Sequence, residues 1–404
     1  MAAQPVGLGV VGVGALALRG LLPHLTEDDV VDQVRVVAVC DPVVERARAA
    51  AARYGIPHVF GSADEMLASA DVQAVTIASP IGLHFEHARL ALEAGKHVHV
   101  NKTMTTTVAE ADELISLAEA NCLKIVASPG EILRPQIAET RRLIEDGVIG
   151  EVAWAICGSA FGTYHETDEP ERVALAGDPI TPGWYFRKPG GGPLYDMTVY
   201  GLHQMTAVLG PARRVTAMSG TRVPRRRFLG VDLEVDADDN TVLCLDFGDS
   251  LFAIAYGTAA GEVSQQFGAG IYFGTKGVIE GVLLNGERFE FPRSELTLDA
   301  PVTDWDAQIR ALPEVVGPHR SIPEAHVFAD VLELVGAILG DRAPLVSAEH
   351  ARHVIDIIES GYRAAETGLA QELTTTFERP SLDQLSARAQ GAWSQAGCLE
   401  RSQA

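Results

Sequence analysis

The first 128 residues alternate short apolar runs with amphipathic segments. The apolar runs have the length of buried strands, and the amphipathic segments place their apolar residues at helical spacing. Strands are expected at residues 6–12, 34–41, 72–79, 97–101 and 123–130, and helices between them include 42–55 and 85–96. This alternation predicts βαβ units and a parallel sheet covered on both faces. The order is typical of a dinucleotide-binding domain of the Rossmann type.

Beyond a helix expected at residues 136–150, the pattern changes to longer alternating runs at 151–162, 213–223, 240–258 and 264–284. Turn signals at Asp249 and at Gly274 with Gly277 predict hairpins between such runs. Two helices, near residues 323–339 and 347–368, complete the pattern. The expected fold class is therefore α/β, with three segments. They are an N-terminal Rossmann domain at 1–128, an α+β domain with a large, mostly antiparallel open sheet at 129–375, and a polar tail or docking helix at 376–404.

Composition changes this picture mainly by limiting the partners. The chain has 404 residues, 47% of them hydrophobic, which is enough for two cores. A formal net charge of −22 argues against nucleic acid or an anionic membrane as a partner. Five scattered cysteines without a CxxC pair are typical of a reduced cytoplasmic protein. No positive residue precedes the apolar start, so no targeting segment is expected.

The stretch "GVVGVGALA" carries a dinucleotide-binding signature. Gly12, Gly14 and Ala17 form a G-x-G-x-x-A arrangement between the first strand and a helix, and with Ala15 they are the expected cofactor contacts. The first glycine permits a tight turn, the second lets a pyrophosphate approach the backbone, and the small third residue allows close packing. Asp41 ends the second strand, where its carboxylate can accept hydrogen bonds from an adenosine ribose and would repel a 2′-phosphate. The motif therefore predicts NAD(H) in preference to NADP(H).

A lone lysine follows the strand in "HVHVNKTMTTT". Ligands of open α/β sheets bind beyond the carboxyl ends of the strands, and Asn101 and Lys102 lie at such an end. Both are expected near the cofactor, and Lys102 can also hold a substrate hydroxyl and stabilise the alkoxide formed as hydride leaves. Thr107 and Glu110 predict a capping box at the start of the next helix.

Three polar residues occur at helical spacing in the second domain. Asp196, Tyr200 and His203 are spaced i, i+4 and i+7, which places them on one helical face as a possible proton-transfer set. The alternative is an aspartate at a helix N-terminus with a buried Tyr and His behind it. The presence of Lys102 at a strand end favours the first interpretation.

Other candidate residues lie just before three consecutive glycines. Trp184 and Tyr185 can pack against the apolar side of a sugar ring, and Arg187 can bind hydroxyls or the cofactor; a contact between domains explains all three equally well. No His, Cys, Asp or Glu cluster has a familiar ligand spacing, including residues 165–169, so no metal site is expected.

Taken together, these segments resemble the glucose-fructose oxidoreductase, inositol dehydrogenase and rhizopine-catabolism family over residues 5–375. The similar segments are the glycine turn, "ASPIGLHFEHARLALEAGKHVHVNKTM", "RRLIEDGVIGEV", the triple glycine and "GTKG". The resemblance implies that Lys102 is the catalytic lysine and Asp196 the helix aspartate. It places Tyr200 at a position held by histidine or tyrosine in relatives, and His203 facing the substrate. It also implies that Ser79, Pro80 and His84 line the nicotinamide side.

Two departures from the family's Glu-Lys-Pro motif surround the lysine. Asn101 replaces the glutamate and so removes a carboxylate that can orient Lys102. Thr103 replaces a proline that is commonly cis in relatives, so a trans bond after Lys102 is expected.

The resulting functional hypothesis is an NAD(H)-dependent oxidoreductase of a sugar, sugar derivative or cyclitol, a class that rests on the resemblance. Lys102, Tyr200 and Asp196 are its catalytic residues, and His203, Tyr185, Arg187 and Lys102 bind substrate. One alternative keeps a tightly bound NAD within each turnover, as in sugar-sugar oxidoreduction or redox-assisted glycoside cleavage. Another is a non-catalytic NAD-dependent sensor or scaffold. A homodimer or homotetramer is expected, as in relatives.

Overall fold

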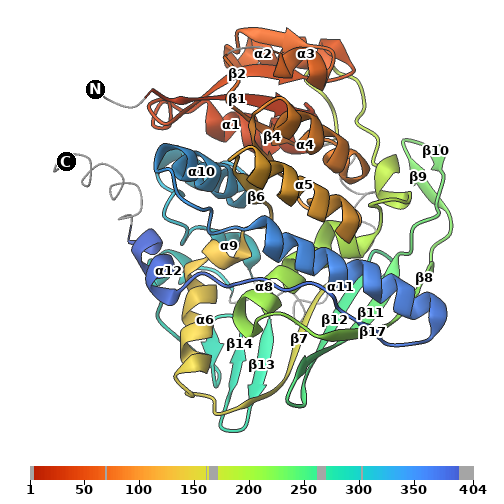
Figure 1. The fold of residues 1–404 in the computed structure, drawn as a ribbon, viewed down its shortest axis with the longest axis vertical. Helices are drawn as coiled ribbons and strands as arrows, with labels where there is room; N and C mark the ends of the chain where they lie inside the picture. Colours follow the sequence, from red (N-terminus) through yellow and green to blue (C-terminus); the bar gives the residue numbers. More distant parts are fainter. Residues whose placement is uncertain are drawn as a thin grey trace.

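The fold is known from a computed structural model that describes residues 4–68, 71–160, 162, 172–261, 270–301 and 304–390 (Figure 1). Six parallel strands form the first sheet, in the order β3-β2-β1-β4-β5-β6. They are β1 (Val6–Val11), β2 (Val34–Cys40), β3 (His58–Phe60), β4 (Ala74–Ile77), β5 (His97–Val100) and β6 (Ile125–Ala127). Every residue of β1 is buried, as expected of a central strand covered on both faces. The strand order reverses between β1 and β4, which creates a crevice at their carboxyl ends.

Helices cover the first sheet. A π-helical turn, Ala17–Leu21, leads into α1 (Leu22–Leu25), and the other helices of this domain are α2 (Val44–Tyr54), α3 (Ala63–Leu67), α4 (His84–Glu93) and α5 (Val108–Ala120). The predicted capping box is present, because Thr107 and Glu110 exchange hydrogen bonds between side chain and backbone at the start of α5. The expected Rossmann arrangement is confirmed.

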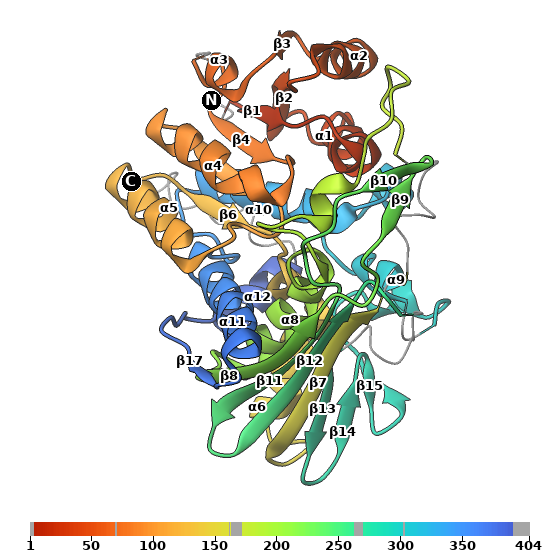
Figure 2. The same ribbon diagram turned by 90° about the vertical axis from the view of Figure 1, so that its right-hand side faces the viewer.

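Nine strands form the second sheet, in the order β16-β15-β14-β13-β7-β12-β11-β8-β17 (Figure 2). They are β7 (Val152–Ala160), β8 (Arg214–Gly220), β11 (Asn240–Gly248), β12 (Leu251–Thr258), β13 (Ile271–Gly274), β14 (Val278–Glu280), β15 (Leu283–Leu284), β16 (Glu287–Arg288) and β17 (Gln371–Glu372). The pairs are antiparallel except that of β7 with β12. The ribbon β9 (Arg226–Phe228) with β10 (Val231–Leu233) stands apart. The mostly antiparallel open sheet is thereby confirmed.

One face of the second sheet is covered by helices and the other is exposed. The helices of the second domain are α6 (Pro135–Glu145), α8 (Val199–Leu209), α9 (Trp305–Ile309), α10 (Ala325–Leu339), α11 (Ala348–Thr367) and α12 (Leu382–Ala389). The exposed face carries an apolar group that includes Trp154, Met218, Phe252 and Ile254. Within the part of the chain that is described, no helix is both long and apolar enough to cross a membrane.

Helices α10 and α11 join the two domains. They come late in the chain but pack beside β5, β6 and α5 of the first domain (Figure 1). A buried series of side-chain hydrogen bonds holds α10 against the first domain. Ser128 Oγ donates to Asp330 Oδ2 (2.5 Å), and His99 contacts Ser128 Oγ through Nε2 (2.8 Å) and Thr76 Oγ1 through Nδ1 (2.7 Å). Burial raises the pKa of Asp330 to about 7 and lowers that of His99 to about 3.

Part of the expected C-terminal tail is a docked helix. Helix α12 begins with a capping box at Ser381 and packs against α6. Its Arg388 is buried, and it donates to Glu314 Oε1 (2.6 Å) and to the carbonyl of Leu133 (3.3 Å). Of the two alternatives expected for this segment, a polar tail or a docking helix, residues 382–389 form the docking helix.

Candidate active site

A cavity of about 1570 Å³ lies at the carboxyl ends of β1, β4 and β5, between the two domains. Ligand pockets usually measure about 300–1,000 Å³, so this one has room for a dinucleotide and a second ligand. Its walls come from the strand ends of the first domain, from β7 and α8, and from residues of the segment 304–327 that precedes and begins α10.

The glycine turn forms one end of the cavity. Gly12 has φ +91°, and a Cβ there would lie 2.9 Å from the carbonyl oxygen of Ala78, so both conformation and space require glycine. Gly14 and Ala15 line the cavity. Ala17 is completely buried behind it, so it contributes packing and does not reach a ligand. The turn has the shape needed for a pyrophosphate to approach the backbone.

Asp41 lies beside this turn and lines the cavity. Its Oδ2 accepts from the backbone N–H of Val13 (2.9 Å), and its Oδ1 accepts from the N–H of Val43 (2.9 Å). Each carboxylate oxygen can accept a further hydrogen bond, so the group remains available to a ribose diol. The residues present thus fit a nicotinamide adenine dinucleotide.

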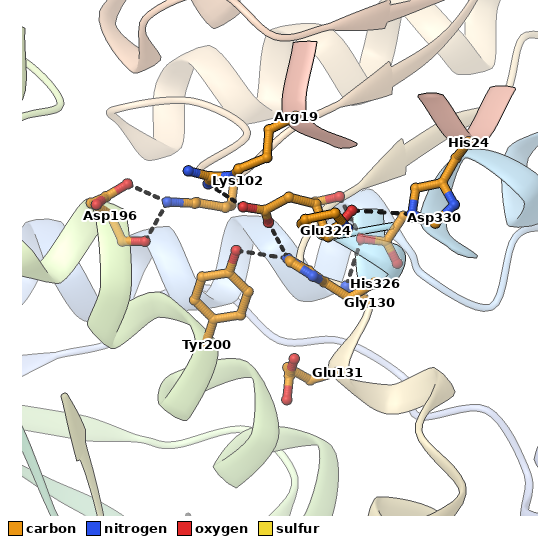
Figure 3. A network of polar contacts seen from close by, with 12 residues as sticks. Arg19, His24, Lys102, Gly130, Glu131, Asp196, Tyr200, Glu324, His326 and Asp330 are labelled. Carbon is orange, nitrogen blue, oxygen red and sulfur yellow. Dashed lines mark hydrogen bonds and ion pairs between the residues drawn. The ribbon is translucent and has the colours of Figure 1, made fainter. Parts of the chain in front are cut away.

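Lys102 connects the end of β5 with the π-helical turn, Leu194–Thr198, that precedes α8. Its Nζ forms an ion pair with the Asp196 carboxylate and donates to the Asp196 carbonyl (2.6 Å). The same Nζ lies 5.5 Å from the centre of the Tyr200 ring, and the Tyr200 hydroxyl lies 3.1 Å from His326 Nε2 (Figure 3). The structure therefore brings together Lys102, Asp196 and Tyr200, the three predicted catalytic residues.

The neighbours of Lys102 differ from the expectation in one respect. The Lys102–Thr103 peptide bond is cis, so the predicted trans bond is wrong. Thr103 Oγ1 donates to the carbonyl of Tyr195 (2.6 Å), which ties this loop to the second domain. Asn101 is buried and lines the cavity, and its Oδ1 has no hydrogen-bond partner among the described residues.

Helix α8 and the turn before it present only part of the predicted face. The residues of this segment that line the cavity are Asp196, Met197, Tyr200, Gly201 and Gln204, so two of the three predicted residues face it. His203 is buried, and its ring lies 4.6 Å from that of His350 on α11. The prediction that His203 binds substrate is wrong. The reason is that the cavity lies beside Gly201 and Gln204, on the other side of Tyr200 from His203, whose ring faces α11.

Of the predicted cofactor contacts in the loop after β4, two line the cavity and one does not. Ser79 and Pro80 line the cavity. His84 does not line it; the side chain is completely buried, with Nδ1 2.7 Å from the carbonyl of Thr103 and Nε2 2.8 Å from that of Ser79. His84 therefore connects the two loops that form the wall and does not contact a ligand itself, which corrects its prediction as a cofactor contact.

Tyr185 and Arg187 do not reach the cavity either. Tyr185 is buried between Trp184 and Phe186, with ring centroids 5.8 Å and 5.3 Å away. Arg187 pairs with Glu234 and with Asp236 (3.1 Å) within its own domain. Trp184 is the residue of this segment that lines the cavity. The substrate-binding predictions for Tyr185 and Arg187 are thus wrong, whereas Trp184, the other aromatic candidate of this segment, does face the cavity.

Several cavity residues were not predicted from the sequence. The segment 304–327 supplies Arg310, His319, Glu324 and His326, and Glu131 lies after β6. His326 stands in the apolar run of α10, where a polar residue was the only signal. Residues 165–169, considered above as metal ligands, lie outside the described residues; among those described, no group of three or more possible ligands is present.

Comparisons with known proteins agree with this architecture. Residues 6–127 match the model of the oxidoreductase family with an NAD-binding Rossmann fold, GFO_IDH_MocA, and residues 137–280 match the GFO/IDH/MocA C-terminal domain. An uncharacterized oxidoreductase, ORF334, from Rhizobium meliloti is 32% identical over 48% of this chain and 53% of its own length. The matched region thus spans about half of that relative.

Other similarities extend over nearly the whole chain. The D-glucoside 3-dehydrogenase of Escherichia coli is 24% identical over 92% of this chain and 99% of its own. The crystal structure of the WlbA dehydrogenase from Bordetella pertussis, in complex with NADH and UDP-GlcNAcA, aligns with a TM-score of 0.71 at 18% identity and covers 93% of this chain and 99% of that one.

Proposed function

The chain belongs to the GFO/IDH/MocA oxidoreductase family, and on this premise we propose that it transfers hydride between NAD(H) and a carbon of a sugar, sugar derivative or cyclitol. The reacting carbon carries a secondary alcohol or a ketone. The observation that supports this proposal is the convergence of Lys102, Asp196 and Tyr200 on a cavity that also contains the glycine turn and Asp41. The D-glucoside 3-dehydrogenase among the relatives supports the substrate class.

Each of the three residues has a distinct part in this reaction. A bound nicotinamide supplies the hydride acceptor or donor. The ammonium of Lys102 stabilises the developing alkoxide, as a fixed charge does best in a site with little water. Asp196 holds that ammonium in place through its ion pair, and Tyr200 exchanges a proton with the substrate oxygen.

A substrate panel tests this proposal. Aldoses, amino sugars, glycosides and inositols are incubated with the protein, with NAD and NADP in parallel, and the absorbance of reduced nicotinamide is followed. At least one polyol is expected to be oxidised. Tight binding of NAD without turnover of any member would instead support a sensor or scaffold.

Asp41 is expected to select NAD. In Asp41→Asn the charge is lost, so the hydrogen bonds to the ribose weaken and the repulsion of a 2′-phosphate disappears. Hydrogen bonds to a charged group contribute about 1.5–3 kcal/mol, so kcat/KM for NAD should fall roughly 10- to 100-fold while that for NADP rises. Initial rates with both cofactors measure this; an unchanged ratio would exclude Asp41 as the selecting residue.

A second candidate function, in which NAD stays bound through both half-reactions, is supported by a strap over the ribose end of the cavity. The strap comprises residues 172–181 of the second domain. Arg46 on α2 donates to Asp178 Oδ2 (2.6 Å) and to the carbonyl of Pro179 (3.0 Å). Arg172, Ile180 and Thr181 of the strap line the cavity, as Asp41 does.

Loss of the strap contact is expected to release the cofactor faster. Arg46→Ala should raise the dissociation rate of NAD about tenfold, because a partly buried charge-assisted contact contributes up to roughly 1.5 kcal/mol. Stopped-flow fluorescence of NADH measures the rate, and the absorbance of freshly purified protein near the reduced-nicotinamide band reports retention. Rapid NAD exchange in the unaltered protein would count against this second function.

The exposed sheet face supports the proposal of a homodimer or homotetramer. Trp154 and Phe252 are neighbours on β7 and β12, and Trp154 stacks on Phe273 at 4.2 Å between ring centroids. Phe252 is 46% exposed and Met218 77% exposed. Contiguous apolar surface of this kind marks an interaction site. In light scattering, the unaltered chain should have two or four times the monomer mass, and Phe252→Glu should shift it to the monomer; a monomeric unaltered chain would refute the assembly.

A further inference from the structure

The Tyr200 hydroxyl has a histidine behind it that no sequence motif points to. His326, at the start of α10, places Nε2 3.1 Å from the Tyr200 hydroxyl, and the two rings meet edge to face with centroids 5.6 Å apart. Both residues line the cavity, and His326 lies on the side of the Tyr200 hydroxyl that faces away from the Lys102–Asp196 pair (Figure 3). The histidine side chain is 7% exposed, so bulk water hardly reaches it.

A carboxylate accompanies this histidine. Glu324 Oε2 lies 3.7 Å from His326 Nε2, and the other oxygen of the same carboxylate pairs with Arg19. Glu324 has φ +63°, and its Cβ lies against Gly20, where an added Cβ would be 2.4 Å away. Arg19 and Gly20 belong to the helical turn that follows the glycine turn. The cofactor-binding end of the first domain therefore positions the carboxylate beside His326.

Burial and nearby charges together set the protonation states of Tyr200 and His326. Burial, followed by Arg134, Lys102, Arg19 and His24, lowers the pKa of His326 well below its usual value. Burial, followed by the carboxylates of Glu324, Asp196, Glu131 and Asp330, raises the pKa of Tyr200 well above its usual value. At neutral pH the pair is thus a phenol facing a neutral imidazole, in which the phenol can donate and a ring nitrogen can accept.

We propose that His326 is the proton acceptor behind Tyr200 and that Glu324 stabilises the imidazolium formed there. This inference rests on the proposed function. The hydride, with its electron pair, leaves the substrate carbon for the nicotinamide, and the C=O bond forms from the electrons of the O–H bond. The hydroxyl proton moves to Tyr200 Oη while the phenol proton moves to His326 Nε2. Reduction of a ketone runs the same steps in reverse. Because His326 acts through Tyr200, it is a positioning residue.

The arrangement follows the logic of an activated proton-transfer unit. A hydroxyl too weak to exchange its proton alone is paired with a histidine, and a third, ionised group stabilises the histidine cation. In a Ser-His-Asp triad the carboxylate contacts the other ring nitrogen, whereas here the hydroxyl and the carboxylate both face His326 Nε2. Here Tyr200 comes from α8 and His326 with Glu324 from the start of α10, so the unit combines two helices of the second domain, and Arg19 of the first domain pairs with its carboxylate.

Kinetics of His326→Ala, with His350→Ala as a matched control, provide the first test. His350 is also fully buried, but it stacks on Phe377 and lies outside the cavity lining. For His326→Ala we expect kcat to fall roughly 100-fold or more with NAD affinity unchanged, since proton transfer contributes about 10²–10⁴-fold. Added imidazole should restore at least about tenfold of that loss, and it should not affect the control. A kcat within threefold of the unaltered enzyme, or a loss that imidazole does not restore, would overturn the proposal.

A second measurement needs no turnover. In protein labelled with ¹⁵N-histidine, the resonance absent from His326→Ala identifies His326, and its shift tells an unprotonated from a protonated Nε2. We expect an unprotonated Nε2 at neutral pH whose resonance moves in Tyr200→Phe. A protonated Nε2, or no response to Tyr200→Phe, would refute the relay. If no panel substrate reacts, the proposed function fails while this measurement still decides the state of His326.

Discussion

Lys102→Ala is expected to lower kcat about 10³-fold while the affinity for NAD stays within about threefold. The loss is large because Nζ is the cation held at the meeting point of both domains, and its two contacts with Asp196 fix it there. Without it, the alkoxide has no fixed positive charge beside it. The affinity is preserved because the glycine turn and Asp41 bind the other end of the dinucleotide. Initial rates with the best panel substrate, and calorimetric titration with NAD, measure the two quantities.

Two further variants show whether the loss of activity in Lys102→Ala comes from the missing charge at this position. Lys102→Met retains most of the side-chain volume without the charge, so it should be as inactive as the alanine variant. Lys124→Ala removes a lysine outside the cavity that pairs with the exposed Asp341, and it should retain full activity. Near-normal turnover in Lys102→Ala would show that Lys102 does not stabilise the alkoxide.

Arg388→Ala should lower the free energy of unfolding by about 3–5 kcal/mol, since removal of one partner of a buried ion pair leaves the other charge uncompensated. Arg388 is 4% exposed and pairs with Glu314 (2.6 Å), with Glu333 a further 3.8 Å contact. Glu314 adjoins Val315 of the cavity wall. The variant should therefore also weaken substrate binding, seen as a higher KM.

Arg142→Ala is the control for Arg388→Ala. Arg142 likewise pairs with two carboxylates, Glu139 (2.6 Å) and Asp146 (2.5 Å), but its side chain is 47% exposed. Exposed pairs contribute about 0–1 kcal/mol. Urea unfolding followed by circular dichroism compares the two variants. Equal midpoints would show that α12 does not stabilise the fold.

The elements of the first domain were largely predictable because each depends on local pattern. The strand at 97–101, predicted from alternation, is found at His97–Val100, and the capping box at Thr107 is found as expected. The glycine turn was also predictable, because one short segment carries both the conformational requirement and the space for the ligand. Lys102 could be placed because parallel strands end at one edge of the sheet.

The remaining parts of the site depend on tertiary packing, which the spacing of residues along the sequence does not show. His203 was misplaced because helical spacing does not show which side of Tyr200 faces the cavity; Gly201 and Gln204 lie on that side, whereas His203 faces α11. His326 and Glu324 were missed because they meet Tyr200 only through the packing of α10 against the first domain, more than a hundred residues further along the chain. Tyr185 was misassigned because neighbouring aromatic residues cannot be assigned to inside or outside without the tertiary fold.

The position of α10 has a consequence for the synthesis of the protein. The face of the first sheet that α10 covers includes Val126 in β6, which shares a hydrophobic cluster with Val331 of α10. About 200 residues separate these two elements, so at about 5–20 residues per second the ribosome needs roughly 10–40 s to supply the cover. During that time the apolar face of the first sheet stays uncovered, and transiently exposed apolar surface of this kind is prone to aggregation. The segment 304–327, which carries His326 and forms one wall of the cavity, is therefore synthesised only after the first domain is complete.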